Sequence, residues 1–156
     1  TSHGGQILEN VIRALTLRGF AIRSHDQHQN DKRQLFDVNH KRVLIKNYPY
    51  ETIFGTCGRR EYYLVSQEWT GQLECKFQNT SGSTDEKMVY ISETLRRSNE
   101  RSLVVVHGGH FWTDHPRGKR VIAWLAEEAN RLRELDKLLL CFDMDGFFEW
   151  VRRTFK

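Results

Sequence analysis

The order of the periodic segments predicts an α/β fold, with a mixed central sheet flanked by helices on both sides. Apolar residues recur at helical spacing near the start of the chain and again in residues 118–135. A continuous apolar run at residues 102–106 is typical of a strand that is covered on both faces. The first half of the chain carries several strand-like segments joined by turn residues, which favours a meander. The resulting order of helix, meander, helix, strand, helix, strand and helix indicates an α/β sandwich.

The first half of the chain opens with a helix and continues with strands. A helix is expected at residues 5–19, because its apolar residues recur at helical spacing and Gly19 is a stop signal. A short strand at residues 20–23 precedes a polar loop without periodicity at residues 24–34. A hairpin loop at residues 68–71 is expected to join two later strands. The three strands of the meander are expected at residues 42–49, 60–67 and 72–78.

The second half of the chain alternates helices with strands. Ser83 and Glu86 have the spacing of a capping box, which predicts a helix from about residue 84 to residue 97. Gly108 and Gly109 end the apolar run that follows it. The remaining elements are expected to be a strand at residues 102–106, an amphipathic helix at 118–135, a strand at 137–142 and a short helix at 145–155.

The length and composition suit a soluble domain with its own core. The chain has 156 residues, of which 38% are hydrophobic and 28% are charged, and we expect one domain over residues 1–156. No apolar run reaches the length of a membrane span, and no signal-peptide pattern opens the chain. The sequence starts without methionine, so we expect a trimmed form or a piece of a longer protein.

The cysteines and the net charge bear on location and partner. Cys57, Cys75 and Cys141 are far apart and odd in number, and no CxxC pair occurs. This pattern indicates reduced thiols in an intracellular, cytoplasmic protein rather than a disulfide framework. The formal net charge of +4 is compatible with a polyanionic partner.

One predicted strand carries an acid, a base and an amide on the same face. Alternate residues of a strand share a face, so Glu74, Lys76 and Gln78 project together while the residues between them pack inward. The preceding strand carries Glu61, which the hairpin can bring beside Glu74. Two converging carboxylates bind a hard cation such as Mg²⁺, and a nearby ammonium can orient a water or offset negative charge. The competing interpretation is a solvated strand face with a cross-strand ion pair.

Four stretches of the chain carry a family resemblance. Residues 4–20 form a predicted helix with an acid at Glu9, and residues 58–64 (GRREYYL) contain Glu61. Residues 74–76 read ECK, and residues 76–87 (KFQNTSGSTDEK) place a glutamine and a Ser-Gly-Ser turn after the lysine. In these features the chain resembles the PD-(D/E)xK nuclease superfamily, whose members have a restriction-endonuclease-like core, over roughly residues 4–145.

The resemblance implies a Mg²⁺-dependent DNA endonuclease, in which Mn²⁺ can substitute. Such a phosphodiester hydrolase would leave 5′-phosphate and 3′-hydroxyl ends and act in restriction, repair, recombination or mobile-element processing. By resemblance, the metal ligands would be Glu61 and Glu74, joined by Glu9 and the backbone carbonyl of Cys75. Lys76 would position or help deprotonate the attacking water. Gln78 would contact the scissile phosphate or that water.

The first acid of the motif has competitors. The family often places a Pro-Asp pair there, whereas in this chain the pair is Arg-Glu at residues 60–61. Asp37, Glu51 and Glu68 therefore compete with Glu61. We choose Glu61 because it alone lies on the strand next to the ECK segment.

The expected DNA contacts come from a turn and from basic residues. Ser81 and Ser83 precede a predicted helix N-terminus, whose free N–H groups and dipole suit a phosphate. Lys87, one turn further on, faces either DNA or solvent. A phosphate-binding rim competes with an ordinary solvated face for the basic residues Arg59, Arg60, Arg96, Arg97, Arg117, Lys119 and Arg120.

Three alternatives to this assignment stay open. The first is a structure-specific nuclease for junctions or flaps, since the chain has little room for a base-reading surface unless a homodimer supplies it. The second is a DNA-binding module with a decayed site, and the third is a polypeptide-interaction domain that binds no nucleic acid. A zinc site at His107, His110 and His115 is an alternative to a plain loop after the strand at residues 102–106.

Overall fold

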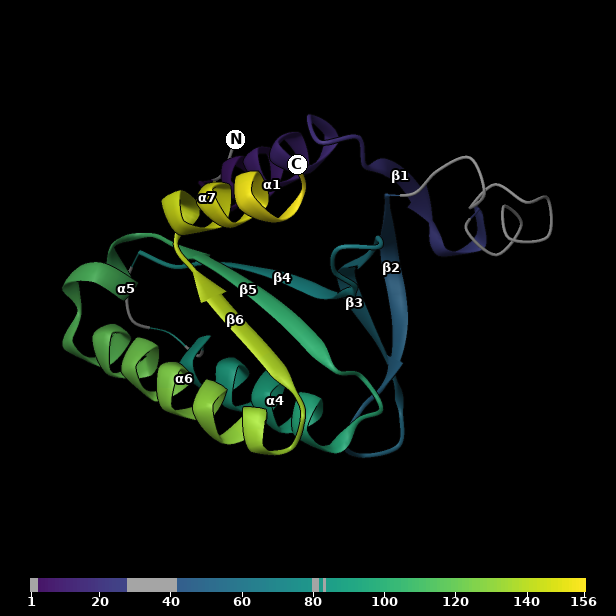
Figure 1. The fold of residues 1–156 in the computed structure, drawn as a ribbon. Coiled ribbons are helices and arrows are strands. Elements are labelled where there is room, and N and C mark those ends of the chain that lie inside the picture. The colour runs from purple at the N-terminus through teal and green to yellow at the C-terminus, as the bar shows by residue number, and fades with distance from the viewer. Residues whose placement is uncertain (1–2, 28–41, 80–81, 83) are drawn as a thin grey trace.

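A mixed six-stranded sheet forms the centre of the protein, in a computed structural model that describes residues 3–27, 42–79, 82 and 84–156 (Figure 1). The strands lie in the sheet in their chain order. The β2–β3 and β3–β4 pairs are antiparallel, and the other three pairs are parallel. The strands are β1 (Ala21–Ser24), β2 (Val43–Glu51), β3 (Cys57–Val65), β4 (Gly71–Phe77), β5 (Ser102–Gly108) and β6 (Leu138–Phe142).

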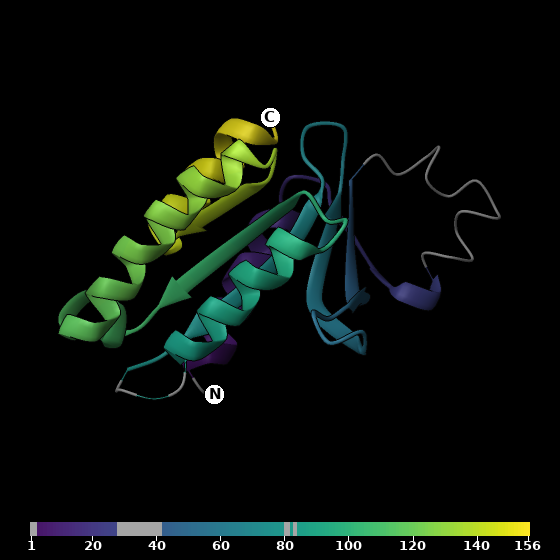
Figure 2. The ribbon, with the colours of Figure 1, turned by 90° about the horizontal axis from the view of Figure 1, so that it is seen from below.

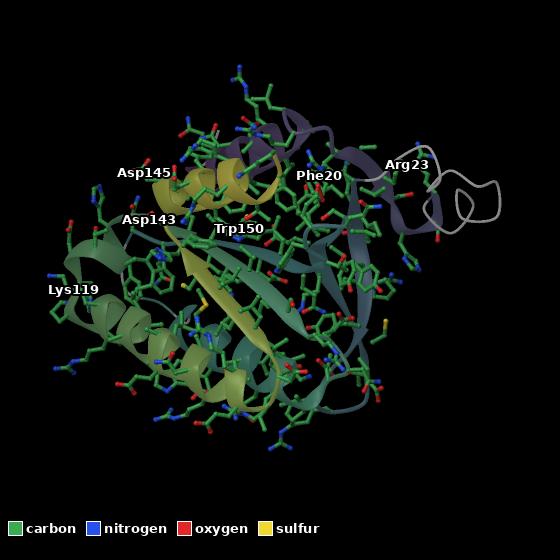
Figure 3. The ribbon with its side chains drawn as sticks, in the orientation of Figure 1. Phe20, Arg23, Lys119, Asp143, Asp145 and Trp150 are labelled. Carbon is green, nitrogen blue, oxygen red and sulfur yellow. The ribbon has the colours of Figure 1, made fainter. Side chains whose placement is uncertain are left out.

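Helices cover both faces of this sheet, as the sequence predicted. On one face, α1 and α7 pack against the sheet, and Figure 3 shows Trp150 pointing from α7 toward the strands. On the other face lie α4, α5 and α6, and Figure 2, seen from below, shows α4 and α6 in front of the sheet. The helices are α1 (His3–Thr16), α4 (Thr84–Arg97), α5 (His110–Asp114), α6 (Pro116–Glu134) and α7 (Met144–Thr154).

Each face of the sheet has its own apolar core. Leu73 and Val104 point toward α1 and α7, whereas Leu103 and Val105 point toward α4 and α6. Because β5 is covered on both faces, every residue from Leu103 to His107 is buried, and this explains its continuous apolar run. The alternation along β4 places Glu74 and Lys76 on the face of α4, since Cys75 and Phe77 pack with the core beneath α1.

Most of the elements expected from the sequence are confirmed, with shifted ends. The helix α5 was not expected, because the segment after β5 was predicted to be a loop. The polar loop predicted at residues 24–34 lies largely outside the described residues. Among the helices of the described residues, none is both long and apolar enough to cross a membrane.

Candidate active site

The site lies where β3 and β4 part. The two strands pair at only three positions, from Leu64 opposite Gly71 to Tyr62 opposite Leu73. The next step in this register would set Glu61 opposite Glu74, and the ladder ends just before it. The strand β4 nevertheless continues to pair with β5 on its other side as far as Phe77. The two acids therefore lie across the opening between β3 and β4.

The pairing of β2 with β3 is irregular beside this opening. The β2–β3 ladder skips one step, at Asn47 and Glu61, between the Lys46–Tyr62 and Tyr48–Arg60 pairs. Asn47 has a positive φ of 53°, which is uncommon for a residue other than glycine. Neighbouring residues of a regular strand point to opposite faces. At this irregular step, however, the side chains of Arg60 and Glu61 both reach toward β4.

Glu74 is the most buried acid of the site and is held between two cations. Its residue surface is only 5% exposed. Lys76 Nζ lies 3.3 Å from Glu74 Oε2, and Arg60 Nη1 lies 3.3 Å from Glu74 Oε1. Each carboxylate oxygen thus faces one positive charge. Burying an ionised carboxylate is costly unless such partners are present, so this pairing explains how Glu74 is accommodated.

Glu61 faces a less favourable environment. Burial raises the pKa of Glu61 above its usual range, and the negative charge of Glu74 raises it further. The close approach of the two carboxyl groups acts in the same direction, because a proton on Glu61 relieves the repulsion between them. The backbone N–H of Cys75 donates to Glu61 Oε1 at 3.4 Å, and this hydrogen bond lowers the pKa of Glu61. A pair of this kind is stabilised when a proton or a cation lies between the carboxylates.

The donor set fits a hard divalent cation. Magnesium binds oxygen, and in proteins it commonly uses one or two carboxylates together with waters and substrate phosphates. Glu61 and Glu74 supply those carboxylates. Burial raises the pKa of the Cys75 thiol, so that the thiol stays protonated and only the backbone carbonyl of Cys75 is a suitable donor. Within the described residues, no group of three or more His, Cys, Asp or Glu side chains is placed to hold a metal.

Lys76 and Gln78 extend this strand toward solvent. The Lys76 side chain is 23% exposed, so its ammonium reaches the surface while it contacts Glu74. Gln78 follows β4, and its backbone N–H donates to the carbonyl of Gly108 at 2.9 Å. The Gln78 side chain lies against Gly82, where an added Cβ would come within 3.1 Å of Nε2. Lys76 therefore contacts the acid pair, and Gln78 lies beside Gly82, two residues before α4.

The other acids considered from the sequence lie elsewhere. Glu9 is exposed on α1, and among the described residues it forms no hydrogen bond or ion pair with the two acids of the site. Glu68 pairs with Arg42 at the opposite end of the β3–β4 hairpin. Glu51 is exposed at the end of β2, and Asp37 lies outside the described residues. Of the described competitors for the first acid, only Glu61 lies beside Glu74.

The basic residues divide into exposed ones and ones used within the fold. Arg59 and Lys87 are exposed, whereas Arg60 is buried and faces Glu74 instead of forming part of an exposed rim. Ser81 and Ser83 lie outside the described residues. Figure 3 shows Lys119 at the outer edge of the molecule, near the start of α6. Several of the predicted rim residues form ion pairs within the fold, namely Arg96 with Glu93 and Glu128, Arg97 with Glu93, and Arg117 with Asp85.

Of the three histidines considered as zinc ligands, His107 lies in β5 and the other two follow it. Burial lowers the pKa of His107, which keeps the imidazole neutral at neutral pH. His115 caps α6 by accepting a hydrogen bond from the N–H of Arg117 at 3.1 Å. His110 pairs with Asp114 on the exposed surface of α5.

The role of Arg60 in the site is not evident from the sequence. Regular alternation places Arg60 and Glu61 on opposite faces, and no residue pattern announces the irregular step at Asn47. Tyr50 and Gln72 also contact Arg60, and neither residue is part of a recognisable sequence motif. The strand distortion brings these side chains into the site.

A comparison with family models agrees with this arrangement. A model described as a PD-(D/E)XK nuclease superfamily domain matches residues 1–155. No curated protein matches the chain, and no solved structure matches it. Nucleases of this superfamily generally use divalent metal ions and act on nucleic acid. Because the match covers nearly the whole sequence, and the mixed sheet with helices on both faces agrees with it, this chain belongs to the PD-(D/E)XK nuclease superfamily.

Proposed function

We propose that this protein is a Mg²⁺-dependent DNA endonuclease that hydrolyses phosphodiester bonds and leaves 5′-phosphate and 3′-hydroxyl ends. The observation that carries the proposal is the contact between Glu61 and Glu74, with Lys76 Nζ 3.3 Å from Glu74. Two acids and a lysine converge where two strands part. A solvated ion pair would not require the half-buried Glu61 to lie beside the buried carboxyl group of Glu74.

Glu61 and Glu74 are the proposed metal ligands, with the carbonyl of Cys75 as a third oxygen from β4. Glu9 stays a proposed ligand on the resemblance alone. When bound there, a divalent ion supplies Lewis-acid chemistry, since it lowers the pKa of a coordinated water and offsets charge on the phosphate. The charge of such an ion would also relieve the repulsion that raises the pKa of Glu61.

Lys76 is the proposed partner of the attacking water and of the phosphate charge. Its ammonium is fixed by Glu74 on one side and reaches solvent on the other. A compact cation in this position can hold the nucleophile by a hydrogen bond and stabilise negative charge that develops on the phosphate. Gln78, the residue that follows the same strand, is proposed to bind a phosphate oxygen or the water.

DNA is the proposed substrate, and its phosphates would bind basic side chains around the site. Arg59 on β3 and Lys87 on the first turn of α4 are exposed and available for such contacts. Ser81 and Ser83 are proposed to add hydrogen bonds at the start of α4. The net charge of +4 supports a polyanionic substrate.

The test is cleavage of several DNA forms with and without Mg²⁺ or Mn²⁺, followed by mapping of the ends. Plain duplex, nicked, branched and single-stranded DNA should be compared, because cleavage of branched forms alone would favour a structure-specific nuclease. Glu74→Gln is expected to abolish cleavage, and Glu68→Gln, which changes an acid away from the site, is the matched control. Metal-independent cleavage, or equal activity of the two variants, would contradict the proposal.

A further inference from the structure

Arg60 is a buried arginine whose charge faces the proposed metal ligand. Its residue surface is only 3% exposed, and its Nη1 lies 3.3 Å from Glu74 Oε1. Arginine is rarely buried to this extent unless its charge is used. The exposed DNA-binding rim does not require such a residue, and the proposed catalytic steps do not use it.

The guanidinium of Arg60 is fixed on two further sides. Nε donates to Gln72 Oε1 at 2.9 Å, and the guanidinium carbon lies 4.0 Å from the centre of the Tyr50 ring. Gln72 is itself buried in β4, two residues before Glu74 on the same face of the strand. The positive charge is therefore held in place by its surroundings, and it does not move freely as an exposed lysine would.

The contacts of Arg60 leave one guanidinium nitrogen without a hydrogen-bond partner among the described residues. Nη2 is buried and has no hydrogen-bond partner among the described residues. A buried donor without a partner is unfavourable, and such groups occur mainly where function requires them. The arrangement is thus not the one that would best stabilise the free protein, although Nη1 and Nε each donate a hydrogen bond.

We infer that Arg60 is an internal counter-ion of Glu74, which neutralises and orients this carboxylate in the free protein and competes with a divalent ion for it. The inference rests on the proposed function, in which Glu74 is a metal ligand. The two oxygens of Glu74 are already paired, Oε1 with Arg60 and Oε2 with Lys76. A cation that binds Glu74 must therefore approach at least one fixed positive charge.

Arg60 differs from Lys76 in how readily it can give way. Lys76 is partly exposed on a flexible stem, so that it can turn toward solvent when a cation binds. Arg60 is enclosed by Tyr50, Gln72 and Glu74 and has no such freedom. Arg60 consequently lowers the affinity of the free protein for a divalent ion, and it keeps Glu74 in place until the ion binds.

The experiment is a calorimetric titration of Mn²⁺ into the folded protein without DNA. Arg60→Gln should bind Mn²⁺ about tenfold more tightly than the wild type, because a charge close to the site has been removed. Arg59→Gln is the matched control, since it removes the same charge from an exposed neighbour that contacts the carbonyl of Asn47. Its affinity should change by less than about twofold, because solvent screens the exposed charge.

Two further variants secure the result. Arg60→Met keeps an apolar stem beside Tyr50 and should tighten binding in the same way if Arg60→Gln does not fold. Arg60→Lys keeps the charge and should stay within about threefold of the wild-type affinity. Circular dichroism of each variant identifies any that are unfolded.

The outcomes separate this inference from the proposed function. Glu74→Gln should lose Mn²⁺ binding in the same titration. If it does, and the folded Arg60→Gln and Arg60→Met variants bind no more tightly than the wild type, then the counter-ion role of Arg60 is refuted and the proposed function stands. Unchanged Mn²⁺ binding by Glu74→Gln would refute both.

Discussion

The carboxyl groups of Glu61 and Glu74 lie together at the point where β3 and β4 separate. Two acids that lie together disfavour each other's ionised form. Partial burial raises the pKa of Glu61, and the negative charge of the buried Glu74 raises it further. The pair therefore costs stability at neutral pH unless a cation or a proton lies between the two groups.

Glu61→Gln should stabilise the metal-free protein while it abolishes cleavage. The amide removes the repulsion with Glu74 and keeps an oxygen that can accept from the N–H of Cys75. In the presence of a chelator, the melting temperature should rise by roughly 2–4 °C, the shift that about 1 kcal/mol produces in a domain of this size. Thermal unfolding followed by circular dichroism measures it.

Glu68→Gln provides the control for that stabilisation. Glu68 pairs with Arg42 near the surface, and a hydrogen bond from Arg42 lowers the pKa of Glu68. Removing this charge should lower the melting temperature slightly or leave it unchanged, and cleavage should continue. A lower melting temperature for Glu61→Gln would show that the acid pair does not strain the free protein.

Gln78→Ala should reduce cleavage less than a change at either acid. The side chain lies beside Gly82 at the end of β4, where it can orient a phosphate or a water without binding a metal directly. The loss expected for such an outer partner is about 10–100-fold in the single-turnover rate. Asn79→Ala, at the exposed neighbouring position, is the control. A Gln78→Ala rate equal to that of the control would remove Gln78 from the site.

DNA binding should weaken steeply with salt. Each phosphate contact with duplex DNA contributes a log–log slope of roughly −0.9, measured with Ca²⁺ in place of Mg²⁺ so that no turnover occurs. Arg59→Ala and Lys87→Ala should each make the slope shallower by about that amount. Arg60→Ala should not, because Arg60 is buried against Glu74. An affinity that does not depend on salt would exclude a phosphate-based interface.

Glu128→Gln should destabilise the fold without affecting chemistry. Burial alone would raise the pKa of Glu128, but hydrogen bonds from Arg131 and Arg96 outweigh it and lower the pKa below the usual range. Glu128 is 4% exposed on α6, and its bond with Ser92 links it to α4. Because the pKa is lowered, this stabilisation is present above the usual glutamate pKa and is lost as the pH falls through the lowered one.

The expected cost of Glu128→Gln is about 1–3 kcal/mol at neutral pH, as for other buried charged hydrogen bonds. Urea unfolding at neutral and at acidic pH measures it, and the difference from the wild type should shrink as the pH falls. The exposed neighbour Glu127 offers the control Glu127→Gln. Equal stability of the two variants at neutral pH would contradict the assigned role of Glu128.

Most helices and strands could be predicted from the sequence, because hydrophobic periodicity and the residues that start or end an element are visible within a short segment. The helix expected at residues 84–97 from its capping-box spacing is α4, Thr84–Arg97, and Asp85 and Glu86 lie in its first turn. The unexpected α5 has five residues, too few to show a helical period, and it is fixed by burial of Phe111 and Trp112. Pro49 was expected to end β2, yet the strand continues to Glu51 because the β2–β3 hairpin is longer than expected.

The site could be predicted in part for the same reason. The face shared by Glu74 and Lys76, and the hairpin that carries Glu61, follow from strand alternation and loop length. The contact of Arg60 with Glu74 depends on the irregular step at Asn47, which is a property of the whole β2–β3–β4 arrangement. The residue pattern of a single strand does not reveal an irregular pairing between strands.

The central claim is that Glu74 and Lys76 serve one reaction, and Lys76→Ala tests it most directly. Single-turnover cleavage of a DNA duplex should be measured beside calorimetric Mn²⁺ binding for the wild type, Glu74→Gln, Lys76→Ala and Lys76→Arg. Lys46→Ala, an exposed lysine on β2, is the control.

Lys76→Ala should lose cleavage by about three orders of magnitude or more and still bind Mn²⁺, because the lysine acts on the water and the phosphate charge and is not a ligand. Lys76→Arg should not restore the rate, since a planar guanidinium does not replace a compact ammonium. Glu74→Gln should lose cleavage and Mn²⁺ binding together. Cleavage by Lys76→Ala at the wild-type rate would instead mean that Lys76 and Glu74 form an ordinary ion pair, and it would contradict the proposed nuclease site.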